Sequence, residues 1–559
     1  MKKIVYIAYA LILFVSVSRA QNTGLPKEEI NIHVSEKCVL PGDEMWLTVY
    51  VSNQKDLPGK TISNLAFVEF VSDKNQSLVR KKILLEAGVG TSSITIPDTL
   101  STGIYHLLVY TNWAKNFGEN AFASSKIMVV NPSQNNGLNK TPDSTAEMVS
   151  ENLEGQIRID LNKSEYNCRE KVELAFYTDK TFDEPLVYSV SVAPKLSAKL
   201  KGYFQQVTYN TNSQTVNEIK YYPDYNGFLL SGTLINKYNN QFIPDKEIVM
   251  SFPGETVQID YAKTDKNGAF RFLLKPEQGE KDIVFNLPGE EAVIRFDESF
   301  VNGFKQMPEK IKLELDERTW DECKRMYVFS QLQKKFGQSN IALHNMDSKN
   351  VEPDFFGDVY QKVFLKDFTR LDSIAEYFYE LTPTVHFQKR KGEQLLFLTN
   401  PETNFQLGDN PAVFVDGVYY PDNTELALLD YNVVEQINVI PQNYFYKDQV
   451  FNGIVSVFTY KKNFSDASQL ETMNRLIYPL TDSYNDFKVE KLIKDNRIPD
   501  LRRLLHWSTA DWNAGEKIQN VTFFTSDIDG AYTITITAVT KLGEVLTGET
   551  TLRVKTEKE

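Results

Sequence analysis

Three short polar runs in the sequence have a spacing that could hold a metal ion. His33 and Glu36 have the His-x-x-Glu spacing found in catalytic zinc sites. Such a site also needs a third ligand, a catalytic carboxylate and a substrate-binding Arg on an α/β scaffold. This pair instead ends a run with the apolar pattern of a β-sandwich strand. We therefore predict no metal at His33 and Glu36.

Asp265 and Asp527 each open a run that resembles the start of a calcium-binding loop, Asp-Lys-Asn-Gly268 and Asp-Ile-Asp-Gly530. Neither run has the Glu at position 12 that completes such a loop. Asp and Gly are also favoured in the tight turns of β-hairpins. We predict a hairpin turn at both positions and no metal ligand.

The sequence shows no arrangement of residues that is typical of an active site. It contains no Gly-x-Ser-x-Gly, no P-loop and no dinucleotide-binding Gly cluster, and its five His residues are scattered over different predicted modules. We predict that the protein is not an enzyme and has no catalytic residue and no cofactor.

Composition narrows the class of protein and of partner. The chain has 559 residues and a formal net charge of −13, whereas nucleic acid and anionic lipid surfaces require a cationic footprint. Hydrophobic residues at 42% and charged residues at 24% are ordinary for globular proteins, and 12% aromatic residues favour β structure. At about 100–200 residues per domain, the length predicts three to five domains. The negative net charge predicts that the protein has no nucleic-acid partner.

The first 20 residues have the pattern of a cleaved export signal. Lys2 and Lys3 precede the apolar run Ile4–Val17, and Ser18 and Ala20 occupy the −3 and −1 positions of a cleavage site. The run is shorter than the about 20 apolar residues of a transmembrane helix. The residue directly after the cleavage site is Gln21 and not Cys, and no later apolar run is long enough to span a membrane. We predict a signal peptide over 1–20, no lipid anchor and no transmembrane helix in the mature chain.

The three cysteines give no disulfide framework. Cys38, Cys168 and Cys323 are an odd number at wide spacing. At most one bridge can form between them, and three buried thiols are equally compatible with the sequence. Both possibilities stay open.

Apolar and alternating runs separated by Gly and Pro predict a mainly β, multi-domain protein. One helix is expected over 316–336, with Trp320, Cys323, Tyr327 and Leu332 along one side, and a second over 371–381. The predicted modules are a β-sandwich over 21–135, a linker over 136–150, a second β-sandwich over 151–200 plus 510–559, a third β unit over 226–300, a helical connector over 301–382, a small α/β unit over 383–465 and a linker over 466–509.

The second sandwich is predicted to be split in sequence. Residues 156–192 supply only three strands, which is too few for a closed sandwich. The stretch 98–111 in the first sandwich and the stretch 527–540 near the C-terminus share an Asp, then a Gly, then a Tyr two residues later, followed by an alternating strand. The C-terminus therefore carries late strands without a beginning. We predict that residues 150–200 pair with residues 515–559.

Two β modules resemble known families. Residues 30–132, through the stretch Leu100–Trp113, resemble the macroglobulin-type β-sandwich. The reactive thioester of that family needs a Gly-Cys-Gly-Glu-Gln stretch, and none of the three Cys has these neighbours, so covalent trapping of proteases is not implied. Residues 227–300 resemble the carboxypeptidase-regulatory-like sandwich, which is common at the start of TonB-dependent outer-membrane receptors.

The α/β unit resembles the plug domain of TonB-dependent receptors. The resemblance rests on the blocks Pro411–Gly417, Val433–Ile440 and Asn452–Lys461, in order and at compatible spacing. The chain that follows is too short for the 22-stranded barrel of such a receptor. The resemblances imply macroglobulin/immunoglobulin-like β-sandwiches with an inserted plug-like domain, in an exported protein of the periplasm or outer membrane of Gram-negative bacteria.

Without a barrel, the plug-like unit could be covered by its own chain or present a surface to a partner. We expect a non-catalytic binding or scaffold protein that is accessory to an outer-membrane transport or surface assembly, with an outer-membrane barrel protein or a surface lipoprotein as partner. The alternatives are a macroglobulin-type protease inhibitor without a thioester, a glycan-binding protein, and an enzyme whose site these sequence motifs do not reveal. Asp416 and Gly417 are predicted to form a tight turn. The expected interface anchors, which could instead only fill the core, are Phe414, Val418, Tyr419, Tyr420, Tyr444 and Phe445.

Export makes a direct prediction about the mature protein. Mass spectrometry of the natively expressed protein should find an N-terminus at or near Gln21, because Ala20 occupies the −1 position of the cleavage site. A membrane-bound protein that retains Met1 would contradict the signal peptide.

Overall fold

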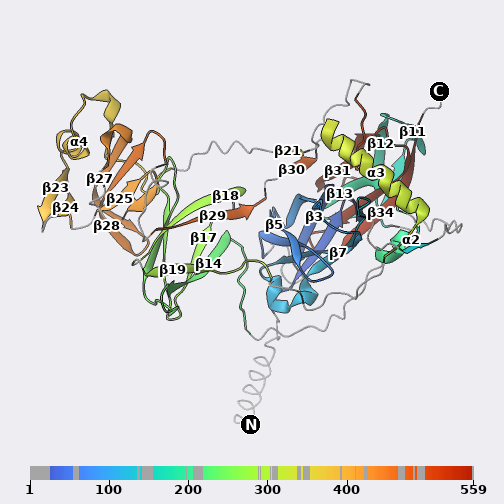
Figure 1. The fold of residues 1–559 in the computed structure, drawn as a ribbon, viewed down its shortest axis with the longest axis horizontal. Helices are drawn as coiled ribbons and strands as arrows, with labels where there is room; N and C mark the ends of the chain where they lie inside the picture. Colours follow the sequence, from blue (N-terminus) through green and yellow to red (C-terminus); the bar gives the residue numbers. More distant parts are fainter. Residues whose placement is uncertain are drawn as a thin grey trace, which may run out of the picture. The chain divides into compact units, whose positions relative to one another are not determined.

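The computed structural model describes most of the chain as two compact units (Figure 1). Unit 1 comprises residues 1–227, 300–344 and 481–559, and unit 2 comprises 228–299 and 345–480. The described residues are 25–53, 62–134, 139–141, 155–196, 198–204, 218–287, 289, 291–301, 304, 313–336, 341–343, 353–390, 393–408, 411–420, 426, 429–463, 473–482, 485–487 and 498–556. The predicted signal peptide lies outside them. Among the described residues, no helix is long and apolar enough to cross a membrane.

The first sandwich of unit 1 is made of two sheets whose inner faces share one core. Only the pairing of β2 with β8 is parallel. The 3-10 turns η1 (Ala114–Phe117) and η2 (Glu119–Ala121) follow β7. The strand order of the first sheet is β1 (Glu28–Val34), β3 (Glu44–Asn53), β6 (Val89–Thr95). The strand order of the second sheet is β2 (Cys38–Val39), β8 (Ala123–Val129), β7 (Gly103–Thr111), β4 (Leu65–Val71), β5 (Ser77–Leu84).

The second sandwich of unit 1 joins distant parts of the sequence. Its strand β13 lies between β31 and β33, with Val190 opposite both Ser508 and Ile536. Strands within residues 518–555 therefore share sheets with residues 158–194 and form one core with them. The strand order of one sheet is β10 (Arg158–Leu161), β12 (Lys171–Tyr177), β32 (Ile518–Phe524). The strand order of the other sheet is β11 (Glu165–Asn167), β34 (Val545–Lys555), β33 (Gly530–Val539), β13 (Leu186–Pro194), β31 (His506–Trp512).

The central strands β3 and β13 are buried on both faces. Their polar side chains meet because the outward faces of β1, β3 and β6 contact the outward faces of β13, β31 and β33. Tyr50 donates a hydrogen bond to Ser189 at 2.7 Å, and Thr48 lies 2.7 Å from Thr509. Alternation of apolar and polar residues ordinarily marks a strand with one solvated face. Here the hydroxyl-bearing face is covered by the other sandwich.

The long helix α3 (Glu317–Phe336) also belongs to unit 1. The Asp316 carboxylate accepts a hydrogen bond from the Thr319 amide at 2.8 Å, which caps the start of the helix. Trp320 and Cys323 pack in a cluster with the edge of the first sandwich, whereas Leu332, expected on the same side, is exposed. Short elements nearby are α2 (Ala198–Lys201), η3 (Gly202–Phe204), the pair β9 (Asn139–Thr141) and β20 (Glu314–Asp316), and the pair β21 (Ile341–Leu343) and β30 (Asn485–Phe487).

Unit 2 begins with a sandwich whose core is rich in Phe. The rings of Phe270, Phe272, Phe285 and Phe296 contact one another with centroids 5.4–6.4 Å apart. Asp265 forms a tight turn, since its carboxylate accepts from the amides of Asn267 and Ala269, but the strands on either side of it belong to different sheets, so the predicted hairpin is wrong. The strand order of one sheet is β17 (Ala269–Leu274), β14 (Phe228–Asn236), β19 (Ala292–Phe296). The strand order of the other sheet is β16 (Ile259–Lys263), β15 (Glu247–Ser251), β18 (Gly279–Asn286), β29 (Met473–Thr481).

The rest of unit 2 is a five-stranded mixed sheet with little helix. One face packs with α4 (Ile374–Leu381) and the hairpin of β23 (Val385–Arg390) and β24 (Glu393–Leu398). The other face packs with residues from and next to β16. The order is β22 (Gln361–Phe364), β27 (Val434–Tyr446), β28 (Gln449–Thr459), β25 (Ala412–Val415), β26 (Val418–Tyr420), where only β25 and β28 are parallel; the short turns are η4 (Leu365–Asp367) and η5 (Tyr431–Val433).

Several predicted boundaries are wrong. The segment 466–509 is not a linker, because it contains β29, β30 and the start of β31, and 136–150 contains β9. The segment 301–382 is only partly helical, and its last part supplies β22 and α4 to the five-stranded sheet. The missed strands are short or, like β29, lie at a sheet edge, where a proline such as Pro479 is tolerated.

The split sandwich makes a prediction about stability. Replacing the fully buried Ile534 of β33 by Ala should lower the free energy of unfolding by about 2–4 kcal/mol, because it leaves a cavity in the core shared by the two segments. Ile518→Ala provides a control in the same sandwich, since Ile518 is 55% exposed and its loss should change stability by less than about 0.5 kcal/mol. Thermal unfolding measures both, and equal effects would contradict the shared core.

Candidate functional site

Most of the expected interface anchors fill the core of unit 2. Phe414 on β25 and both Val418 and Tyr420 on β26 are buried. Tyr419 and Tyr444 are partly buried and pack in the cluster around Phe414. The expectation that these side chains present a surface is therefore wrong for the three buried residues, because the sandwich of unit 2 covers this end of the sheet. Of the six, Phe445 is exposed.

Asp416 and Gly417 form the tight turn that joins β25 to β26. Both have positive φ angles, 47° and 82°. The buried Asp416 carboxylate accepts hydrogen bonds from the Thr459 amide and hydroxyl, each at 2.6 Å. A Cβ atom on Gly417 would lie 2.4 Å from the Phe252 carbonyl oxygen, so glycine is required here. Asp416 has a structural role and fixes the end of β28.

The strands β27 and β28 extend beyond the sheet as a two-stranded ribbon over residues 443–452. Their other partners, β22 and β25, reach only Val439 and Ile454. On the outer face of this ribbon, Phe445 and Val450 lie directly opposite each other and are 72% and 50% exposed. The ribbon thus presents a continuous apolar pair to solvent.

The inner face of the ribbon is fixed to the sandwich of unit 2. The Tyr446 hydroxyl donates to the Ile259 carbonyl at 2.9 Å, Lys447 pairs with Asp260, and the Asp448 amide donates to the Tyr261 hydroxyl. These contacts hold both strands near the turn. Phe445 and Val450 are therefore held in a defined position, which lowers the entropy cost of binding.

A small open pocket of about 400 Å³ lies elsewhere in unit 2. None of its lining side chains carries a charge. The hydroxyl oxygen of Thr384 is buried there and has no hydrogen-bond partner, whereas Tyr360 is 56% exposed. The lining residues are Tyr360, Gln361, Pro383, Thr384, Thr399, Pro401 and Asn404.

A buried ionic cluster links the two sandwiches of unit 1. The Arg503 guanidinium lies 2.9 Å from the Glu36 carboxylate and also contacts Asp43, and all three side chains are nearly inaccessible. Burial and the neighbouring Asp43 raise the pKa of Glu36 to about 7, against the opposing effect of Arg503. The Ser330 hydroxyl of α3 donates to Asp43 at 2.8 Å, so the helix also joins this cluster.

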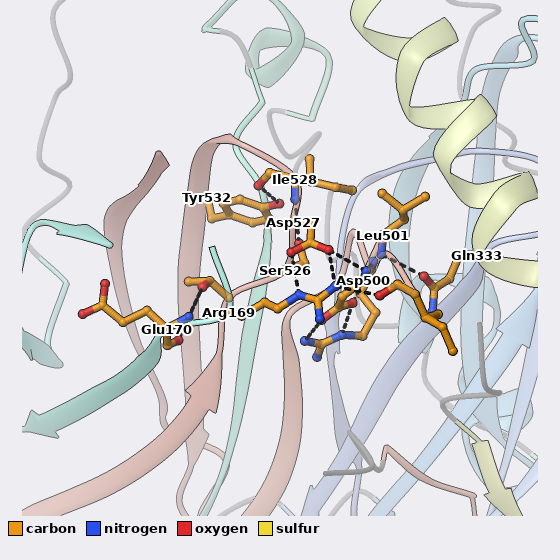
Figure 2. Close-up of polar contacts among 12 residues, drawn as sticks. Arg169, Glu170, Gln333, Asp500, Leu501, Ser526, Asp527, Ile528 and Tyr532 are labelled. Atoms are coloured by element: carbon orange, nitrogen blue, oxygen red, sulfur yellow. Dashed lines mark hydrogen bonds and ion pairs between the residues drawn. The ribbon is translucent and has the colours of Figure 1, made fainter. Parts of the chain in front are cut away.

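Figure 2 shows a second ionic cluster, in which the Asp527 carboxylate lies between Arg169 and the backbone of Asp500. Arg169 donates two hydrogen bonds to Asp527, at 2.6 and 2.7 Å, and Arg502 donates two to Asp500 at the same distances. The prediction of a hairpin turn at Asp527 is wrong, because β32 and β33 belong to different sheets. Asp527 anchors the chain between the sheets. Gln333 of α3 accepts from the next amide, that of Leu501, at 2.8 Å.

His33, the candidate zinc ligand, contacts the second sandwich. Its Nδ1 atom lies at hydrogen-bonding distance from the Ser189 hydroxyl, and its Nε2 atom lies 3.1 Å from the Thr535 hydroxyl. Burial lowers the pKa of His33 to about 3, so the ring is neutral. Glu36 binds Arg503 instead of approaching His33. Within the described ranges, no three His, Cys, Asp or Glu residues are grouped as metal ligands.

Sequence reasoning missed the ionic clusters. Asp500, Arg502 and Arg503 lie in a charged run within the predicted linker, and such runs are usually solvated. The sequence does contain one signal of this burial. The apolar residues Leu501, Leu504 and Leu505 lie within and next to the charged run, and such residues are unusual in a solvated linker.

No family model and no curated protein matches the sequence. Among solved structures, it is similar to the methylamine-reacted alpha-2-macroglobulin of Salmonella, at 9% identity and a TM-score of 0.23, over 97% of this chain and 40% of that one. It is also similar to the elastase-activated alpha-2-macroglobulin of Escherichia coli, at 9% identity and a TM-score of 0.24, over 95% and 44%. The chain spans less than half the length of these proteins, and its fold is defined by the strand pairings above.

The Glu36 cluster predicts a pH dependence of stability. Glu36 keeps its proton in the folded protein up to a pKa of about 7, whereas the unfolded chain releases it near 4.5, so this group destabilises the fold as pH rises from about 5 to 8. The unfolding temperature of Glu36→Gln should therefore rise relative to that of the unaltered protein over this range. Glu173→Gln, at an exposed side chain of the second sandwich, is the control. A constant difference across pH would contradict the assignment.

Proposed function

We propose that this chain is an exported, non-catalytic binding protein of the bacterial cell envelope that contacts a protein partner through the outer face of the ribbon 443–452. The observation that carries the proposal is the exposed pair Phe445 and Val450 on a ribbon whose inner face is fixed by Tyr446 and Lys447. Rigid, exposed aromatic and aliphatic side chains are typical of energetic centres in protein interfaces.

The chemistry of the ribbon favours a partner with an apolar groove or an exposed strand edge. A projecting two-stranded ribbon can insert its apolar pair into a groove, as an aromatic anchor does. An outer-membrane barrel protein or a surface lipoprotein is the partner we propose, in keeping with the predicted signal peptide and the plug-like resemblance. The role that follows is accessory to transport or to assembly at the outer membrane.

Crosslinking in the native envelope tests this function. A photoreactive side chain placed at position 445, followed by purification and mass spectrometry, should recover an outer-membrane barrel protein or a surface lipoprotein. The double variant Phe445→Ser, Val450→Thr should weaken that interaction about tenfold or more without changing the unfolding temperature, because both side chains are exposed.

The control is Leu273→Ser on β17, which removes a half-exposed apolar side chain from the other part of unit 2. Binding should be unchanged by this variant. Recovery of the protein alone would contradict the proposal, as would equal losses in the control and in the double variant. Recovery of a protease would instead favour the inhibitor alternative.

The pocket beside Tyr360 supports a second candidate function, the binding of a neutral glycan. An exposed aromatic ring can stack on a sugar, and the side-chain amides of Gln361 and Asn404 supply polar groups in the lining. Saturation-transfer NMR with a panel of neutral oligosaccharides should show contact that Tyr360→Ala removes and Tyr379→Ala, at another exposed Tyr, does not. No transfer to any oligosaccharide would discard this candidate.

A further inference from the structure

Two of the three cysteines lie in one cluster of unit 1. Cys38 on β2 is buried together with Met128 and Trp320. Cys323 follows Trp320 by about one turn of α3, is partly buried and packs against the same cluster. The third thiol, that of Cys168, lies in the second sandwich, 3.7 Å from the Lys555 carbonyl oxygen.

The two clustered thiols interact with each other. A hydrogen bond between them raises the pKa of Cys38 and lowers the pKa of Cys323, and burial further raises that of Cys38. The positive charge of Arg503 acts on both sulfurs. Cys323 is the less buried of the two thiols and is therefore the sulfur that an external disulfide reaches first.

We propose that Cys38 and Cys323 form a disulfide in the presence of an external disulfide oxidant, which fastens α3 covalently to the edge of the first sandwich. The surface of the helix is mostly polar, and beyond the Trp320 cluster it is held by single contacts such as Ser330 with Asp43 and Gln333 with Leu501. The segment that carries α3 also connects the two stretches of chain that build unit 2. A bridge at Cys323 thus attaches to the first sandwich the segment of unit 1 that lies, in sequence, between the two stretches of unit 2.

The chemistry balances as thiol–disulfide exchange. The partly buried Cys323 thiolate attacks one sulfur of the external disulfide, so that a mixed disulfide forms and one external thiolate leaves. Cys38 gives up its proton and attacks the Cys323 Sγ atom, which forms the Sγ–Sγ bond and releases the second external thiolate. The cysteine pair loses two electrons and two protons, and the external disulfide is reduced to two thiols.

The experiment uses the purified full chain with oxidised glutathione as the probe. After denaturation, maleimide labelling should count one free thiol, on Cys168, in place of three before oxidation. Peptide mass spectrometry should find Cys38 linked to Cys323. Three unreacted thiols, separate glutathione adducts on Cys38 and Cys323, or a link that includes Cys168 would each overturn the proposal.

Two variants separate the bridge from effects on folding. Cys168→Ser should still form the link and leave no free thiol, whereas Cys323→Ser should form no internal link. The oxidised, unaltered protein should unfold at a higher temperature than the reduced protein, because the bridge closes a long loop of chain. Cys323→Ser should unfold at the same temperature under both conditions. An unfolding temperature of the linked protein that equals that of the reduced protein would overturn the claim that the bridge fastens α3.

Discussion

The architecture of unit 1 depends on burying a strand face that is rich in hydroxyl groups. A buried polar group without a partner costs about 1–3 kcal/mol, so the hydroxyl pairs formed between the sandwiches favour this packing, although the buried hydroxyls of Ser52 and Thr533 have no hydrogen-bond partner among the described residues. Ser189 meets both His33 and Tyr50, and Thr509 meets Thr48. A shift of one residue in either strand would turn these groups away from one another. The polar face therefore fixes how the sandwiches pair, while the apolar cores stabilise each sandwich separately.

The ionic clusters extend this constraint to the segments that join the sandwiches. Arg503 and Arg169 bind carboxylates from different parts of the chain, and α3 adds Ser330 and Gln333 to the same two clusters. Removing one partner of such a buried pair leaves an uncompensated charge, which costs more than the pair itself contributes. Unit 2 uses a different principle, because its five-stranded sheet is covered on both faces by apolar contacts, and the ribbon that carries Phe445 extends beyond the neighbouring strands of that sheet.

The sequence is informative where local patterns decide the structure. The shared Asp, Gly and Tyr pattern relates the strand β33 to β7, and β33 lies beside β13. The turn at Asp416 and Gly417 follows from residue types that accept positive φ. Burial by distant segments could not be read in the same way. Phe414 and Tyr420 were expected at a surface because nothing local shows that β16 and α4 cover the sheet, and Asp500 to Arg503 look solvated without knowledge of Asp527 and Glu36.

The central claim is that the hydroxyl-rich face makes the two sandwiches of unit 1 one cooperative body. Native-state hydrogen exchange, followed by mass spectrometry as denaturant is raised, tests this claim most directly. Peptides from β3, β13 and β33 should reach one common opening free energy and lose protection together. Loss of protection in β3 while β13 and β33 stay protected would contradict it, because the sandwiches would then open independently.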